Sequence, residues 1–321
     1  MDMRLKKTYK LPWNMTLGAI TNNNLVQQFG EHLGAHCKRM GIHINFAPVV
    51  DINTNPDNPI IGNRSFGENK ENVTNKAMAF TLGMQSKGVL ANAKHFPGHG
   101  DTATDSHHTL PVLNFDLKRL DSVELYPYKR VFDVGIASVM TAHLSIPSLE
   151  PNGSLPTSLS KKVVTNLLQQ KLGFNGLVIT DGLNMKGAAN YATSSEIDLA
   201  AIKAGNDLLL IPQDVPATVR LIKKAIELKT LTEKRINISV RKILKAKYWA
   251  GLHNYTPVVL DNLDNDLNTL SDDLLHHELV KNSLTLVKDN EATIPFKNLD
   301  KHKIAYVKLG DDSGSNFINT L

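Results

Sequence analysis

Five short, nearly continuous apolar segments alternate with longer amphipathic segments between about residues 23 and 250. Strands that are apolar along their whole length are typical of parallel sheets buried on both faces. The alternation therefore predicts a parallel α/β domain. It leaves open whether the sheet is an open, doubly wound one or part of a closed barrel. The predicted strands cover residues 42–50, 89–95, 137–143, 176–181 and 207–211.

Seven helices are expected between and after these strands, and polar residues lie where the strands end. The carboxyl ends of parallel strands meet at one edge of a sheet, so polar residues there indicate a functional site. The residues at these ends are Asp51, Lys94, His95, His143 and Asp181. The expected helices lie near residues 23–40, 70–87, 117–134, 160–172, 195–204, 215–228 and 232–250.

Composition excludes several classes of protein. With 321 residues, 41% of them hydrophobic, the chain can bury a core of one barrel-sized domain or two ordinary ones. The net charge of +5 is spread along the chain without a basic block, so we expect no nucleic-acid partner. No apolar run approaches the roughly 20 residues of a membrane span. Residues 1–7 are charged and lack the pattern of a signal peptide.

Residues 94–108 hold four histidines, two aspartates and a lysine, together with Pro97 and Gly98, which exclude a regular helix. One hypothesis is a metal site, because histidine and aspartate are common metal ligands. The broken helix argues against it, since His95 and His99 then do not share a helix face. The candidate ligands are His95, His99, Asp101, Asp105, His107 and His108.

Acid–base chemistry is the second hypothesis for this loop. Asp105 precedes His107 by two residues, close enough for the carboxylate to fix the imidazole tautomer. Asp181 ends an apolar strand, where a carboxylate can be a nucleophile, a metal ligand or a helix N-cap. Arg64 lies in a loop rich in Asn and Pro, where it either binds a polar substrate by two hydrogen bonds or is a surface arginine.

Taken together, five motifs resemble glycoside hydrolase family 3, in particular its bacterial β-N-acetylglucosaminidase branch. They occur in the family's order and cover roughly residues 10–250. The motifs are FAPVVD (46–51), IGNRSFG (61–67), KHFPGHGDT (94–102), DSH (105–107) and ITDGLNMKG (179–187).

The resemblance implies a retaining glycosidase with a role for each matching residue. Asp181 matches the catalytic nucleophile, and His107 matches the general acid/base, with Asp105 as its partner. The residues that match the sugar-binding positions are Arg64, Lys94 and His95. The implied substrate is an N-acetylglucosaminide, with a β-glucoside as the alternative, and no metal or other cofactor is implied.

The resemblance also implies a (β/α)8, or TIM, barrel of which this chain holds the last five strands. We therefore expect an incomplete catalytic barrel over 1–250, a linker over 251–274, and the beginning of a second α/β domain over 275–321. Two open sheet edges predict that this chain alone is poorly stable or inactive. A non-catalytic carbohydrate-binding remnant is then an alternative to an enzyme.

Overall fold

A computed structural model describes residues 7–104, 109–151, 155–301, 303 and 305. Its centre is a five-stranded parallel sheet in which every strand pairs with the next one along the chain. A doubly wound sheet would reverse direction at a switch point, whereas this order is that of successive strands in a β/α barrel. The strands are β1 (Ile44–Asn45), β2 (Leu90–Phe96), β3 (Ser138–Thr141), β4 (Leu177–Gly182) and β5 (Leu208–Leu210).

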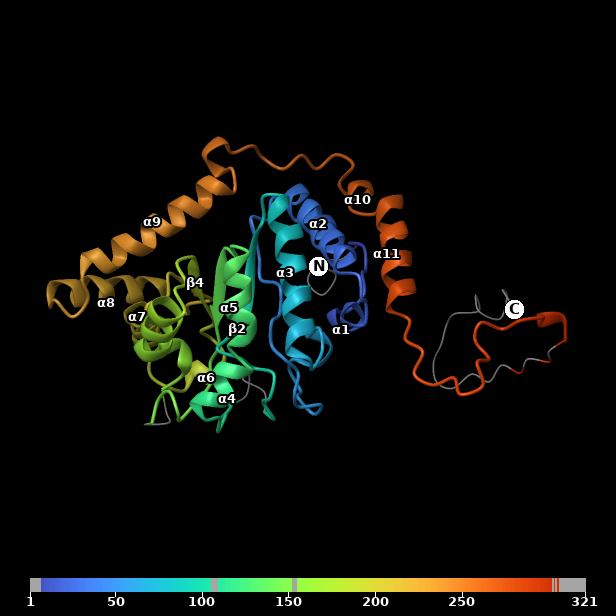
Figure 1. Cartoon of the computed structure of the whole chain (residues 1–321). Helices are drawn as coiled ribbons and strands as arrows, with labels where there is room; N and C mark the ends of the chain where they lie inside the picture. The colour runs from blue at the N-terminus through green and yellow to red at the C-terminus, as the bar shows by residue number, and fades with distance from the viewer. Residues whose placement is uncertain (1–6, 105–108, 152–154, 302, 304, 306–321) are drawn as a thin grey trace. The chain divides into compact units, whose positions relative to one another are not determined.

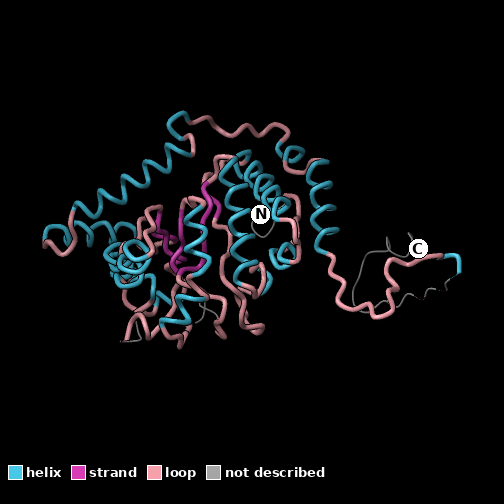
Figure 2. The backbone as a smooth tube through the Cα atoms, viewed as in Figure 1, coloured by secondary structure: helices cyan, strands magenta, loops and turns pink. Residues whose placement is uncertain are grey.

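Helices follow the strands and cover the sheet (Figures 1 and 2). Helix α2 packs on α3, and α3 packs on α5. The prediction of a parallel α/β domain is confirmed. The longer helices are α2 (Asn23–Arg39), α3 (Lys70–Ser86), α5 (Tyr126–Asp133), the π-helix η3 (Lys162–Lys171), α7 (Ser194–Ala204), α8 (Val215–Glu227), α9 (Glu233–Trp249) and α11 (Leu270–Ser283).

Short helical turns complete the described chain. None of the helices in its described ranges is long and apolar enough to cross a membrane. The turns are α1 (Asn14–Gly18), η1 (Gly62–Arg64), α4 (Leu117–Ser122), η2 (Thr157–Leu159), α6 (Lys186–Ala189), η4 (Leu252–Asn254), α10 (Leu263–Asp266) and η5 (Leu299–Lys301).

The central strands are buried on both faces, as their continuous apolar sequences predict. All four residues of β3 are buried, and so are most residues of β2 and β4. The outer strands β1 and β5 are half-buried along their described lengths. The core therefore lies between the central strands and the helices, and it fixes the ends of β2 and β4 where the polar residues emerge.

Two predicted elements differ from the structure. The strand expected over 42–50 is only two residues long, because Pro48 has no N–H to donate and only Val49 forms a further bridge, to Lys94. The helix expected over 117–134 is two helices, α4 and α5. The chain turns between them, and Pro127 then occupies the first turn of α5.

The structure divides into two compact units, residues 1–284 and 285–321. Helix α11 belongs to the first unit, where Leu275 and Leu279 are buried in its core. In the second unit, the described residues form η5 and no strand. Residues 284–287, whose apolar sequence is typical of a strand, form none in the structure, and Val287 is 90% exposed. The domain boundaries derived from the resemblance remain a prediction.

Candidate active site

Asp51 joins the ends of β1 and β2. Its carboxylate accepts hydrogen bonds from three N–H groups: the backbone N–H of His95 (3.1 and 3.2 Å), the backbone N–H of His99 (2.8 Å) and the Nδ1–H of His95 (2.7 Å). Burial alone would raise the pKa of Asp51, but the two imidazoles and these hydrogen bonds outweigh it and lower the pKa. Asp51 is therefore a buried anion that fixes the loop after β2.

Arg64 approaches the same site from the loop that ends in η1. Its Nη2 lies 3.3 Å from Nε2 of His95, and its Nη1 donates to the carbonyl oxygen of Ile60 at 3.1 Å. The loop itself is shaped by Asn58, whose Oδ1 accepts hydrogen bonds from the N–H groups of Ile60 and Ile61 at 2.9 Å. Arg64 is thus a positioned side chain, which favours the substrate-binding hypothesis over the surface one.

Asp181 lies in the last part of β4, with its backbone held in the sheet. Burial would raise the pKa of its carboxyl, but His95, His143, the N–H of Gly182 and Lys94 together lower it. The Gly182 N–H donates to Asp181 Oδ1 at 2.8 Å. A carboxylate with a lowered pKa is ionised at neutral pH, which is the state that a nucleophile or a ligand requires.

His143 follows β3 and contacts the backbone of the turn after Asp181. Its Nε2 lies 3.0 Å from the carbonyl oxygen of Gly182, and its Nδ1 lies 2.6 Å from Oγ of Ser158. Burial lowers the pKa of His143 more than the neighbouring Asp181 raises it, so the imidazole is neutral at neutral pH. A neutral imidazole between a donor and an acceptor orients the turn without adding charge.

The loop after β2 packs tightly against the segment that follows β1. A Cβ on Gly100 would lie 1.8 Å from the carbonyl oxygen of Ile52, so only glycine fits. Asn58 donates to the carbonyl oxygen of His99 at 2.9 Å, and Nδ1 of His99 contacts Oγ1 of Thr102 at 2.7 Å. These contacts fix the loop as far as Thr102.

The predicted acid/base pair, Asp105 and His107, lies outside the described residues, as does His108. The predicted sugar-binding residues Arg64, Lys94 and His95 and the predicted nucleophile Asp181 all belong to the same edge of the sheet. Their roles remain predictions. Within the described ranges, no three His, Cys, Asp or Glu side chains are placed to hold one metal ion.

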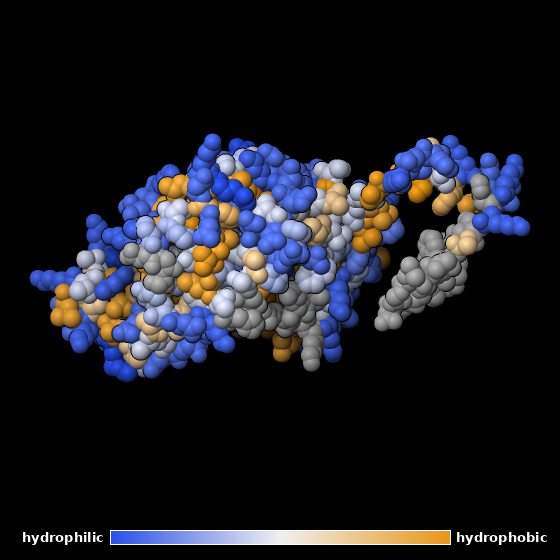
Figure 3. Space-filling model, turned by 90° about the horizontal axis from the view of Figure 1, so that it is seen from below, coloured by the Kyte–Doolittle hydropathy of each residue, from blue (hydrophilic) through white to orange (hydrophobic). Residues whose placement is uncertain are grey.

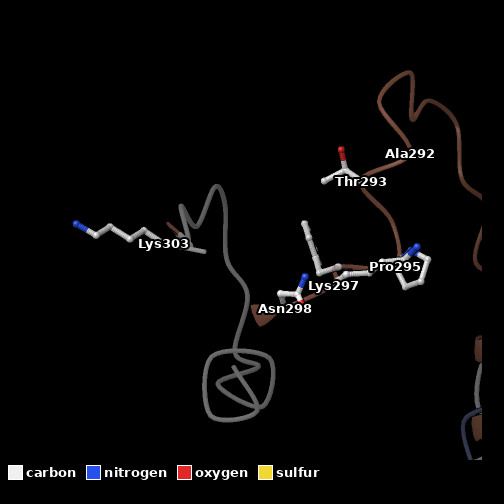
Figure 4. A pocket seen from close by; sticks show the side chains of 7 residues that line it. Ala292, Thr293, Pro295, Lys297, Asn298 and Lys303 are labelled. Carbon is white, nitrogen blue, oxygen red and sulfur yellow. The ribbon is translucent and has the colours of Figure 1, made fainter. Parts of the chain in front are cut away.

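A pocket elsewhere contains none of these residues. It lies within the second unit, and Figure 4 shows its side chains on the chain around Pro295. Because it has no carboxylate or imidazole, it offers no group for acid–base or nucleophilic chemistry. The pocket is lined by Ala292, Thr293, Pro295, Phe296, Lys297, Asn298 and Lys303.

Figure 3 shows the molecule from below the view of Figure 1. On this face, patches of hydrophilic and hydrophobic residues alternate.

Comparison with known proteins decides the family. The model of the glycosyl hydrolase family 3 N-terminal domain matches residues 2–246, about three quarters of the chain. The chain belongs to glycosyl hydrolase family 3.

The names of three similar proteins indicate what those proteins act on. Beta-hexosaminidase A of Pseudoalteromonas piscicida is 29% identical over 320 residues, 93% of this chain and 52% of that protein. The structure of a family 3 beta-N-acetylglucosaminidase from Paenibacillus sp. strain FPU-7 has a TM-score of 0.83 and 37% identity, covering 87% of this chain and 54% of that one. A beta-glucoside phosphorylase has a TM-score of 0.83 and 25% identity, covering 90% and 54%. The chain spans about half the length of these relatives.

Sequence reasoning placed Asp51 and His143 at strand ends but gave neither a role. Their partners lie far away in the sequence: Asp51 binds residues 44 and 48 positions later, and His143 contacts Gly182 39 positions later. Ser158 is the partner of His143 on the other side of the ring. No local pattern indicates such pairs, although a polar residue after an apolar strand does indicate that a role exists.

Proposed function

We propose that this family 3 glycosidase removes terminal β-linked N-acetylhexosamine with retention of configuration. Asp181 is the nucleophile, His107 the general acid/base and Asp105 its partner. The observation that carries the proposal is the environment of Asp181, an ionised carboxylate at the carboxyl end of a barrel-type strand with imidazoles and Lys94 around it. The roles of His107 and Asp105 rest on the sequence resemblance.

The reaction has two steps, each with a balanced transfer of electrons and protons. Asp181 attacks the anomeric carbon while the glycosidic C–O bond breaks, and the leaving oxygen takes a proton from His107. Water then attacks the glycosyl-aspartate, gives its proton to His107 and releases the carboxylate. An imidazole suits both roles, because its unperturbed pKa is close to neutral pH.

Arg64, Lys94 and His95 bind the sugar hydroxyls in this proposal. Arginine and lysine supply only donors, so they suit the lone pairs of hydroxyl oxygens. His95, whose Nε2 faces Arg64 at 3.3 Å, adds a group that can accept a hydrogen bond from a hydroxyl. A site with both donors and an acceptor can bind hydroxyl groups in either role.

Hydrolysis of 4-nitrophenyl N-acetyl-β-glucosaminide by the full chain tests the proposal. The wild-type chain is expected to release nitrophenol, whereas Asp181→Asn is expected to lose activity by about 10³-fold or more. Asp198→Asn is a matched control, because Asp198 is also buried but bonds Thr218 in the helical layer. Release of nitrophenol by the wild-type chain would contradict the separate expectation, drawn from the open sheet edges, that the chain alone is inactive. Saturable sugar binding without turnover would contradict the proposal and favour the carbohydrate-binding alternative.

The same assay separates the remaining alternatives. Faster release from 4-nitrophenyl β-glucoside than from the N-acetylglucosaminide would favour a β-glucosidase. Loss of activity in chelator would favour a metal-dependent hydrolase. Because one structural relative is a beta-glucoside phosphorylase, the reaction is also run with inorganic phosphate. Formation of a sugar 1-phosphate would show that phosphate, and not water, is the acceptor of the glycosyl group.

A further inference from the structure

The tautomer of His95 is fixed from both sides of its ring. On one side, Nδ1 lies 2.7 Å from Oδ2 of Asp51, and an ionised carboxylate can only accept a hydrogen bond, so Nδ1 carries the proton. On the other side, Nε2 lies 3.3 Å from Nη2 of Arg64, and a guanidinium can only donate. Nε2 therefore presents a lone pair.

Burial and backbone hydrogen bonds hold Asp51 and His95 in place. Asp51 is 2% exposed and His95 is 4% exposed, so neither ring nor carboxylate can turn toward water instead. Asp51 Oδ1 also accepts the backbone N–H groups of His95 and His99, at 3.1 and 2.8 Å. These backbone bonds aim the second oxygen, Oδ2, at the imidazole.

We propose that Asp51 is a positioning residue that holds His95 in the Nδ1–H tautomer, so that the single lone pair of Nε2 accepts a hydrogen bond from Arg64 in this structure and from a hydroxyl when the sugar is bound. The part that concerns the sugar rests on the proposed function. The part that concerns the tautomer does not. Asp51 does not touch the substrate in this proposal, and it acts through His95 alone.

Asp51→Asn tests the proposal with almost no change of shape. The amide of the new residue can face in either of two directions. We expect its oxygen to face the backbone N–H groups of His95 and His99, because that orientation keeps two hydrogen bonds, whereas facing Nδ1–H would keep one. Its NH2 group then faces Nδ1 of His95 and donates to it. The proton of His95 must move to Nε2, where it meets the N–H of Arg64. The substitution therefore reverses the tautomer while it preserves the backbone contacts.

The tautomer is read directly by long-range ¹H–¹⁵N NMR of the full chain with ¹⁵N-labelled histidine. The signals of His95 are assigned by their loss in His95→Gln. We expect a protonated Nδ1 in the wild type and in the control Asp198→Asn, and a protonated Nε2 in Asp51→Asn. A protonated Nδ1 in a folded Asp51→Asn variant would overturn the proposal. A merely structural role for Asp51 would lower stability without moving the proton.

Arg64→Gln gives a second reading that does not require the buried Asp51→Asn variant to fold. Arg64 lies at the partly exposed rim of the site. With Asp51 intact, His95 is expected to keep its proton on Nδ1 in this variant. Movement of the proton to Nε2 would show that Arg64 sets the tautomer and would overturn the proposal.

Kinetics then connect the tautomer to the sugar. Asp51→Asn is expected to raise KM by about 10-fold with less than about a threefold change in kcat, because His95 and Arg64 hold the sugar before and during the reaction. An unchanged KM in a variant whose tautomer has reversed would overturn the sugar part of the proposal. If the wild-type chain hydrolyses nothing, the proposed function fails, while the NMR result still decides the role of Asp51.

Discussion

Nε2 of His143 lies 3.0 Å from the carbonyl oxygen of Gly182, the residue directly after Asp181. A carbonyl oxygen only accepts, so Nε2 carries the proton and Nδ1 must accept from the hydroxyl of Ser158, 2.6 Å away. The carbonyl oxygen of Gly182 thus sets the tautomer of His143, the hydroxyl of Ser158 satisfies Nδ1, and His143 in turn holds the backbone directly after Asp181. Two side chains therefore orient Asp181 and Gly182: His143, which follows β3, and Ser158 of η2.

This arrangement predicts the effect of Ser158→Ala. Loss of the hydroxyl leaves Nδ1 of the buried His143 without its donor and loosens the contact of the ring with Gly182, so kcat for the chromogenic substrate is expected to fall about 10-fold. The free energy of unfolding is expected to fall by about 1–2 kcal/mol, as for a buried hydrogen bond. Ser138→Ala is the control, since Ser138 is also buried but donates to Ala91 within the sheet. An equal kcat in both variants would contradict the positioning role.

His107→Ala tests the proton transfer assigned to His107. A substrate with a poor leaving group needs a proton donor, whereas nitrophenolate leaves without one. We expect a loss of about 10²–10⁴-fold for a poor leaving group and a much smaller loss for 4-nitrophenol. Asp105→Asn is expected to show the same pattern more weakly. Equal losses for good and poor leaving groups would argue against the acid role.

The lowered pKa of His99 predicts that the folded state loses stability in mild acid. Burial, and then repulsion from His95, lower the pKa of His99 from 6.5 to about 4. As the pH falls, His99 takes up a proton in the unfolded chain near pH 6.5 but in the folded chain only near pH 4. The folded state therefore keeps its full stability above about pH 6.5 and loses stability as the pH falls toward 4. The loss amounts to about 3 kcal/mol.

Urea denaturation between pH 7 and pH 4 measures this loss. His99→Gln removes the titrating group, so its free energy of unfolding is expected to change less with pH than that of the wild type. A parallel pH dependence in the two proteins would show that His99 is not the group responsible.

Gly100→Ala is expected to destabilise the protein by about 3 kcal/mol, because its Cβ would lie 1.8 Å from the carbonyl oxygen of Ile52. The loop that precedes Asp105 would have to move, so activity should fall as well. Gly135→Ala is the control. It has a φ of +73° but open space around its Cβ, and we expect a cost of about 1 kcal/mol. Urea midpoints of the two variants provide the test, and equal costs would contradict the close approach.

The order of strands and helices could be predicted because each apolar run is bounded by polar residues. The break between α4 and α5 could not, because residues 117–134 keep an amphipathic pattern across the turn at Val123. Pro127 was the available signal, since proline favours the first turn of a helix. The sequence pattern also did not decide between a doubly wound sheet and part of a barrel, because the order of the strands depends on pairing between distant segments.

The site was predictable to the extent that its residues end strands or match motifs. Arg64 and Asp181 were singled out in this way, and the structure places each in a fixed environment. The contact of Asp51 with His95 joins residues 44 positions apart, and in the proposal above it sets which nitrogen of the imidazole carries the proton. Tautomers depend on such distant partners, so a sequence pattern alone does not contain them.

In the proposed mechanism Asp181 forms a covalent bond to the sugar, and trapping of this intermediate is the decisive experiment. The full chain is incubated with a fluorinated N-acetylglucosaminyl donor whose glycosyl-enzyme hydrolyses slowly, then digested and analysed by mass spectrometry. The account predicts one added glycosyl unit on the peptide that contains Asp181, and none on that peptide in Asp181→Asn. A label on another residue, or no label on a protein that still releases the leaving group, would contradict it.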